Sequence, residues 1–174
     1  MGRITYNQIN SLPDAIDSTA FELLLGNLPN AGNSLNLTLN CLTASIPGFS
    51  NEAWENNLHG HVQKFRGRKM FTRSLAVTFR ERAGMPGYRA LKAWDEFIVG
   101  TESGSSSGPK NQYAISPELV VYDGEGIVAN RIQFEGFFIQ ELSDIQLDGQ
   151  SSQGMELAAT FSFDRMYADG IQLL

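Results

Sequence analysis

Residues 69–99 decide the fold and read KMFTRSLAVTFRERAGMPGYRALKAWDEFIV. In the first half of this stretch, apolar side chains alternate with polar or small ones. One predicted face of an extended chain consists of Phe71, Leu75, Val77 and Phe79, and the other consists of Thr72, Ser74, Ala76 and Thr78. A period of two predicts a β-strand that buries one face in a core and leaves the other face outside.

The second half of this stretch changes to helical spacing, and we expect a helix over Pro86–Val99. Pro86 suits the first turn of a helix, where its missing N–H has no partner to lose. Gly100 offers a stop. The apolar residues recur at helical intervals and should form the stripe that packs on the sheet. This stripe consists of Tyr88, Leu91, Trp94, Phe97 and Ile98.

Further strands are expected on the N-terminal side. Ala20–Gly26 alternates, and so does Ser34–Thr43, in which leucines and Cys41 fill one predicted face. The opposite face carries no charge and consists of Ser34, Asn36, Thr38 and Asn40. We expect Ser45–Trp54 to be a loop, and a turn near Gly67 to join two extended stretches, 55–66 and 69–82.

The C-terminal half again alternates. Thr101–Asn111 is rich in Ser and Gly and should be an exposed loop. Strands are predicted over Tyr113–Asp123 and Ile127–Gln140, joined by a turn at 123–126, and over Gly154–Met166. In the last of these, Ala158, Thr160 and Ser162 lie opposite the apolar face. The fold class is therefore mainly β, an antiparallel sandwich or barrel-like domain with one α-helix.

Length and charge narrow the classes of protein. The chain has 174 residues, which suits one domain at 20–174 preceded by an arm at 1–19. The net charge is −6, yet residues 51–82 hold seven basic and three acidic residues. This segment is therefore +4, and the rest of the chain is −10. Such a balance argues against a protein that grips nucleic acid. It leaves two readings of the basic segment, a solvated surface of mixed charge or a surface that meets an acidic surface of another copy.

Little in the sequence points to catalysis or to a cofactor. Cys41 is the only cysteine, so no disulfide can form within the chain. His59 and His61 share a face of an extended chain, but no third metal ligand of matching pattern stands near them. The first twenty residues lack a basic start followed by an apolar run, so we expect no signal peptide. We also expect no membrane span, because no apolar run is long enough to form one. We expect no enzyme, no bound metal and no cofactor, and a chain made in a cytoplasm.

The order of the elements is the most informative feature. A strand pair ends in the loop Ser45–Gly48, a Lys/Arg-rich hairpin leads into the alternating strand 69–82, and a helix with a central Trp94 follows. A Gly-Phe-Phe-Ile segment at 136–139 and the run ELSDIQLD at 141–148 precede a Phe-rich final strand. Over residues 20–167 this order resembles the tail tube proteins of contractile-tailed bacteriophages, the T4-like tail tube family.

The resemblance implies six copies in a ring and rings stacked head to tail, with the inner sheets of neighbours joined around a channel. The implied partners are other copies of the chain, the tail sheath protein, the tape measure protein, and the baseplate and tail terminator proteins. Double-stranded DNA would pass through without specific binding, and the protein would lie in the virion tail after assembly in the host cytoplasm. Tubes of type VI secretion systems and R-type bacteriocins share this architecture and remain an alternative.

Two surfaces of such a tube are predicted from the residues. The channel wall should be neutral or acidic, because a basic wall would hold phosphates. The lining candidates are therefore the two uncharged faces, Ser34, Asn36, Thr38 and Asn40 together with Ala158, Thr160 and Ser162. The candidates for contact between subunits are Lys64, Arg66, Arg68, Lys69 and Arg73. Two other readings stay open: a monomeric β-barrel that carries a small apolar ligand, and a hydrolase that uses His59 or His61.

Overall fold

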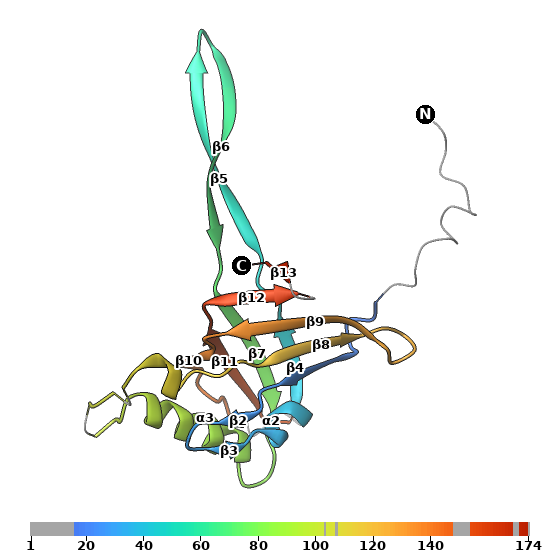
Figure 1. The fold of residues 1–174 in the computed structure, drawn as a ribbon, viewed down its shortest axis with the longest axis vertical. Helices are drawn as coiled ribbons and strands as arrows, with labels where there is room; N and C mark the ends of the chain where they lie inside the picture. The colour runs from blue at the N-terminus through green and yellow to red at the C-terminus, as the bar shows by residue number, and fades with distance from the viewer. Residues whose placement is uncertain (1–15, 103, 107, 148–153, 169–170, 174) are drawn as a thin grey trace.

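The computed structural model describes residues 16–102, 104–106, 108–147, 154–168 and 171–173, and Figure 1 shows their arrangement. The elements, in chain order, are β1 (Phe21–Leu24), β2 (Asn27–Leu28), β3 (Gly32–Asn33), α2 (Leu35–Leu39), β4 (Cys41–Ser45), β5 (Phe49–Leu58), β6 (His61–Phe71), β7 (Ser74–Arg80), α3 (Pro86–Ile98), the 3-10 turn η1 (Lys110–Gln112), β8 (Glu118–Tyr122), β9 (Val128–Glu135), β10 (Phe138–Leu142), β11 (Glu156–Ser162), β12 (Arg165–Ala168) and β13 (Ile171–Gln172).

Two antiparallel sheets form the body of the molecule. One has five strands in the order β1-β8-β9-β12-β13, and the other has four in the order β10-β11-β7-β4. The chain passes between the sheets at Gly136, where φ is +66°. A Cβ atom at this position would collide with the carboxylate of Asp164, so the corner requires glycine. The mainly β, antiparallel class predicted from the sequence is confirmed.

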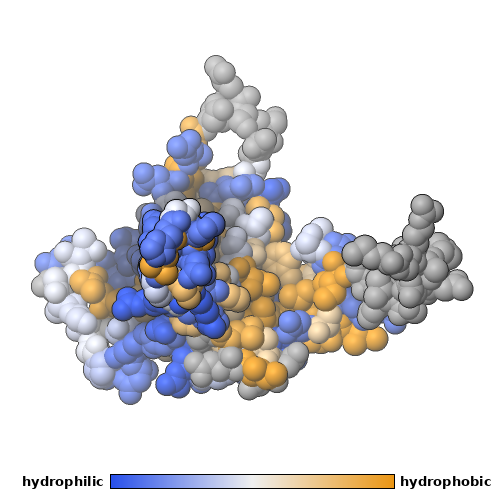
Figure 2. Space-filling view, turned by 90° about the horizontal axis from the view of Figure 1, so that it is seen from above, coloured by the Kyte–Doolittle hydropathy of each residue, from blue (hydrophilic) through white to orange (hydrophobic). Residues whose placement is uncertain are grey.

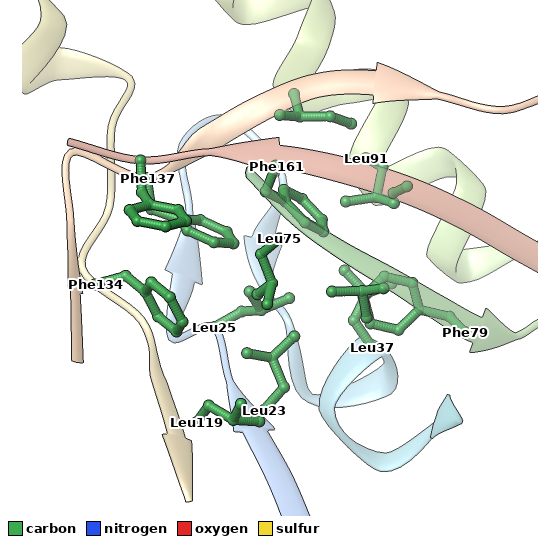
Figure 3. Packing of buried hydrophobic residues seen from close by; sticks show 14 of the residues in the cluster. Leu23, Leu25, Leu37, Leu75, Phe79, Leu91, Leu119, Phe134, Phe137 and Phe161 are labelled. Atoms are coloured by element: carbon green, nitrogen blue, oxygen red, sulfur yellow. The ribbon is translucent and has the colours of Figure 1, made fainter. Parts of the chain in front are cut away.

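The core lies between the two sheets and under helix α3, as Figure 3 shows. Leu75, Phe79 and Phe161 enter it from the four-stranded sheet, and Leu23 and Phe134 enter it from the five-stranded sheet. All five of these side chains are 0–1% exposed. The predicted buried faces of the strands around 20–26 and 154–166 are therefore confirmed. The predicted face over 69–82 is confirmed for residues 74–80 but is wrong at Phe71, which is 39% exposed on β6.

Helix α3 lies against the core as its apolar stripe predicts. Leu91 and Trp94 are fully buried, and Tyr88, Phe97 and Ile98 are half-buried. The Trp94 Nε1–H donates to the backbone oxygen of Tyr113 over 2.9 Å. Its ring stacks on Phe161 with 6.1 Å between the ring centroids. A buried indole N–H needs such an acceptor, and this one ties the helix to the chain that enters β8.

The predicted strand over Ser34–Thr43 is wrong. Residues 35–39 form the short helix α2, and only 41–45 form a strand, β4. Helical spacing turns Leu35 and Leu39 outward and leaves only Leu37 in the core. Ser34 is 3% exposed, and its hydroxyl donates to the backbone oxygen of Gly26. Packing against β1 and α3 therefore overrides the alternating pattern.

Because 35–39 is a helix, the predicted channel-lining face at residues 34–40 does not exist as a strand face. Asn36, Thr38 and Asn40 share no strand face with Ser34, because they lie on α2 and at its end. The side chain of Asn40 forms hydrogen bonds within the molecule. Its Nδ2 donates to the backbone oxygen of Asn36 over 2.6 Å. Its Oδ1 accepts from Arg82 Nε over 2.7 Å. These four residues therefore do not form a polar sheet surface.

The predicted loop over Ser45–Trp54 and the predicted turn near Gly67 are also wrong. Residues 49–58 form strand β5, which pairs with β6 as a long hairpin whose turn lies at His59 and Gly60. Both turn residues have positive φ, +50° and +80°, which is the pattern of a type I′ hairpin turn. Gly67 sits inside β6 at a bulge, where a Cβ atom would come within 3.0–3.2 Å of Glu52.

Three predicted strands are divided in the structure. Of the predicted stretch 69–82, residues 69–71 end β6 and residues 74–80 form β7. Residues 127–140 supply β9 and β10, which belong to different sheets, and residues 154–166 supply β11 and part of β12. The predicted turn at 123–126 does join β8 to β9, with the Asp123 carboxylate accepting from the backbone N–H of Glu125 and Ile127. Of the predicted arm at 1–19, residues 1–15 lie outside the described residues.

Candidate subunit-contact surfaces

On one face of the four-stranded sheet, strands β4, β7 and β11 carry small, uncharged side chains. Ala158, Thr160 and Ser162 alternate along β11 with residues of the core and point away from it. The register places Thr78 and Ala76 of β7 beside Ala158 and Thr160. We call this surface the neutral face; it consists of Thr43, Ser45, Ser74, Ala76, Thr78, Ala158, Thr160 and Ser162. Three of the seven predicted channel-lining residues therefore share one sheet surface.

Charged groups border the neutral face without entering its centre. Arg80 and Glu156 form an ion pair at one end, with 3.4 Å between Arg80 Nη2 and Glu156 Oε1. Glu141 lies opposite Thr160 on the edge strand β10. The one cation on these strands is therefore balanced by a neighbouring carboxylate.

The four-stranded sheet ends in two open edges among the described residues. Strand β4 pairs only with β7, and strand β10 pairs only with β11. The N–H and C=O groups of an open edge can pair with a strand of another molecule. Neither strand contains Lys, Arg or Pro, which commonly protect an edge from such pairing, but each strand has a bulge in its pairing with its neighbour, and β10 carries Glu141. The sheet is therefore open to extension on both sides.

The β5–β6 hairpin projects from the body as a separate two-stranded sheet, as Figure 1 shows. A ten-residue strand such as β5 extends about 33 Å. A two-stranded ribbon is at best marginally stable on its own in water. Seen from above in Figure 2, hydrophobic residues lie among the hydrophilic ones on this projection. An isolated ribbon with exposed apolar groups indicates a contact surface for another chain.

The register and the bulge divide the hairpin into two faces. The apolar face carries the stacked rings of Trp54 and Phe65, 4.6 Å apart between centroids, and also Leu58 and Met70. Trp54 is 53% exposed despite this stacking. Because two bulge residues of β6 stand opposite Glu52, Arg68 shares the apolar face.

The basic face lies on the opposite side of the hairpin. Lys64 pairs with Glu55 at 3.0 Å, and Arg66 follows it along the same face. Lys69 Nζ lies 4.2 Å from the ring centroid of Phe49 and 4.9 Å from that of Phe71. The five predicted contact cations are thus separated, because Arg68 lies with the aromatic pair and Arg73 lies at the base of the hairpin.

The exposed face of the five-stranded sheet differs from the neutral face. Its carboxylates already have partners on neighbouring strands. Glu118 Oε2 pairs with Arg131 Nη1 at 3.2 Å, and Glu118 Oε1 accepts from Gln133 at 2.9 Å. The Tyr122 hydroxyl donates to Glu22 over 2.9 Å, which raises the pKa of Tyr122. This surface is therefore charged, and its carboxylates bind side chains of the same sheet.

The residues considered for catalysis do not come together. His59 and His61 lie at the exposed tip of the hairpin, and no group of three metal-binding side chains occurs among the described residues. Burial raises the pKa of the Cys41 thiol to about 11, so little reactive thiolate forms near neutral pH. Among the described helices, none has the length and apolar character that crossing a membrane requires.

Sequence reasoning missed the apolar face of the hairpin. Its residues do not follow strict alternation, because β6 has one extra residue at the bulge. Glu52 of β5 stands opposite both Gly67 and Arg68 of β6, which shifts the pairing by one position. The signal that was available is the pair His59-Gly60, because a short turn containing glycine between polar extended segments is typical of a hairpin.

The fold is that of components of contractile injection systems and of Hcp1 proteins. A chain from the sheath/tube terminator of the extracellular contractile injection system PVC aligns with a TM-score of 0.64 and 14% identity, covering 91% of this chain and 99% of its own length. A chain from the six-fold symmetrised baseplate of the anti-feeding prophage gives 0.62 and 12%, covering 93% and 100%.

The chain also has the fold of an Hcp1 protein. Hcp1 from Flavobacterium johnsoniae aligns with a TM-score of 0.52 and 7% identity, covering 88% of this chain and 98% of its own length. No protein-family model and no curated protein sequence matches the chain. The resemblance to tail tube proteins noted in the sequence therefore agrees with the fold.

Proposed function

We propose that this chain is a structural, non-catalytic subunit of a contractile tail tube, in which six copies close into a ring and the rings stack into a hollow conduit. The observation that carries this proposal is the four-stranded sheet, which has two open edges and a neutral face. Pairing of β4 of one copy with β10 of the next would complete both edges and continue the sheet around a ring.

The neutral face suits the wall of a channel. A polyanion in transit must not displace counterions by binding fixed cations. Of the two exposed sheet surfaces, this one has small side chains and a single cation, Arg80, which is paired with Glu156. The charged surface of the five-stranded sheet would then face outward, where a surrounding sheath would contact it.

The hairpin suits the contact between successive rings. It lies at one end of the longest axis of the molecule (Figure 1), and neither of its strands pairs with another strand among the residues that the structure describes. A head-to-tail contact of this kind repeats without closing, so it produces a filament rather than a finite ring. The basic residues Lys64, Arg66 and Lys69 add long-range attraction to an acidic partner surface.

Within this proposal, the particular tube is that of a contractile-tailed phage, which delivers a double-stranded DNA genome and lies in the virion tail. Its further partners would be the sheath, tape measure, baseplate and tail terminator proteins. The tube of a secretion or injection particle is the second candidate. It is supported by the fold likeness to chains of the PVC and anti-feeding prophage particles.

Negative-stain electron microscopy of the purified chain tests the tube proposal. Rings with a central opening, or hollow filaments built from them, are the expected result. A protein that stays monomeric at high concentration and low salt, and that carries a bound apolar molecule, would instead indicate a small-ligand carrier. Genes for a DNA-packaging machine beside the gene for this chain would favour the phage tube over an injection particle.

A further inference from the structure

We infer that the groove between helix α3 and the last residues of β10, with the segment that follows them, receives the apolar face of the β5–β6 hairpin of a second copy of this chain. The inference rests on the proposed stacking of rings and adds to it the receiving surface. We call this surface the α3 groove; it is lined by Met85, Tyr88, Lys92, Asp95, Gln140, Glu141, Leu142, Ser143, Asp144 and Ile145.

Apolar side chains line one part of the α3 groove, and its other lining residues are polar. Tyr88, Leu142 and Ile145 are half-buried and pack against the core, and each leaves part of its surface toward the groove. The groove has a volume of about 510 Å³. This lies within the range of about 300–1,000 Å³ that is usual for clefts that hold small molecules. It therefore has room for protruding aromatic side chains.

The rim of the α3 groove is acidic. Asp95 is paired with Lys92 at 3.5 Å, but Glu141 and Asp144 pair with no cation among the described residues. Both of these side chains are exposed. The groove thus combines apolar side chains with two carboxylates that have no counter-charge in the part of the chain that the structure describes.

The apolar face of the hairpin is complementary to this surface. Trp54 and Phe65 supply a rigid stacked pair of the kind that dominates binding energy at protein interfaces. Arg68 stands on the same face and forms no ion pair within the described part of the chain. An aromatic pair beside a guanidinium would therefore meet apolar side chains beside two carboxylates, and none of these three charged groups has an ion-pair partner among the described residues.

The positions of the two surfaces fit a stack. The hairpin occupies one end of the longest axis of the molecule, and α3 and β10 lie toward the other end (Figure 1). A copy placed head to tail along this axis brings the hairpin of one molecule toward the α3 groove of the next. The carboxylates on the five-stranded sheet fit less well, because Glu22, Glu118 and Glu135 already have partners on their own sheet.

Cysteine cross-linking tests the contact. The chain with Cys41→Ser receives either Arg68→Cys with Asp144→Cys, or the matched control Lys64→Cys with Asp144→Cys, whose hairpin cysteine lies on the basic face. After assembly and mild oxidation, the first pair should give a ladder of covalent oligomers on a non-reducing gel, at a yield about tenfold above the control.

The outcomes separate this inference from the proposed function. If the Cys41→Ser parent forms no rings or tubes, the tube proposal fails. If tubes form but the Arg68/Asp144 pair cross-links no better than the Lys64 control, the tube stands and the α3 groove is not the receiving surface. A charge exchange provides a second measurement: Arg68→Glu should slow tube growth, and Asp144→Arg in the same chain should restore it.

Discussion

At the scale of single residues, Glu81 shows how a buried charge organises the fold. This residue is 9% exposed, and its carboxylate accepts from the backbone N–H groups of Arg82, Gly87 and Tyr88 at 3.0, 3.1 and 2.7 Å. Helix α3 has no side-chain cap at Met85, so Glu81 satisfies the free N–H groups of its first turn from outside the helix. Gly87 leaves space for this carboxylate, because a Cβ there would lie 2.9 Å from Oε2.

Replacing Glu81 by alanine should lower the free energy of unfolding by about 1–3 kcal/mol, because buried N–H groups lose their acceptor. Thermal and urea unfolding followed by circular dichroism measure the change. Glu156→Ala is the control, since it removes a carboxylate whose ion pair with Arg80 is exposed. Equal stability of the Glu81 and Glu156 variants would contradict this role of Glu81.

Cys41 makes the free energy of unfolding depend on pH, and the burial of its thiol sets the sign of this dependence. Burial raises the pKa of its thiol from 9.0 to about 11, so the folded state favours the neutral thiol. The stability that this preference contributes is fully present below pH 9 and is lost as the pH rises through 11. Alkylation at pH 8 should therefore be slow in the folded chain and fast in urea. Equal rates in both conditions would show that the thiol is not protected.

At the scale of elements, the neutral face of the four-stranded sheet carries the clearest functional prediction. Ala158→Arg should allow tubes to form but make them retain a short DNA duplex at low salt, because a fixed cation in the channel exchanges counterions with phosphate. Retention should fall steeply as salt is added. Filter retention of labelled duplex by purified tubes measures the effect.

Gln133→Arg is the matched control for this experiment. It adds the same charge to the exposed face of the five-stranded sheet, beside Glu118. Tubes of this variant should behave like those of the parent chain. If both variants retain the same amount of duplex, or neither retains any, then the neutral face does not line the channel.

At the scale of the whole molecule, the body and the hairpin are separate units of structure. The hairpin shares no sheet with the body, and the core cluster contains no residue of β5 or β6. Shortening the hairpin by replacing residues 54–65 with Asn-Gly, between the paired residues Ala53 and Arg66, should therefore leave the melting temperature nearly unchanged. It should abolish tubes, as judged by electron microscopy.

The control for this change keeps the hairpin at full length. His59→Asn retains a residue that tolerates the positive φ of this turn, so the hairpin and the tubes should persist. Tubes of normal length from the shortened chain would contradict a role of the hairpin in stacking. A large loss of thermal stability would instead show that the hairpin supports the body.

The sequence by itself determined the features that depend on near neighbours in the chain. Alternation fixed the core faces of β7 and β11, helical spacing fixed the buried stripe of α3, and Asp123 with its flanking glycines fixed a hairpin turn. The polar side of β11 was predicted for the same reason, since a strand that buries Leu157 and Phe161 must turn Ala158 and Thr160 away from the core.

Only the tertiary structure decided the features that depend on distant residues. The segment 34–43 alternates as well as any strand, yet contacts with β1 and α3 make 35–39 a helix. Likewise, a one-residue bulge placed Arg68 beside Trp54 and Phe65 and set it apart from Lys64 and Arg66. Local patterns cannot fix such positions, because the free energy that selects among them comes from packing and register between segments far apart in the chain.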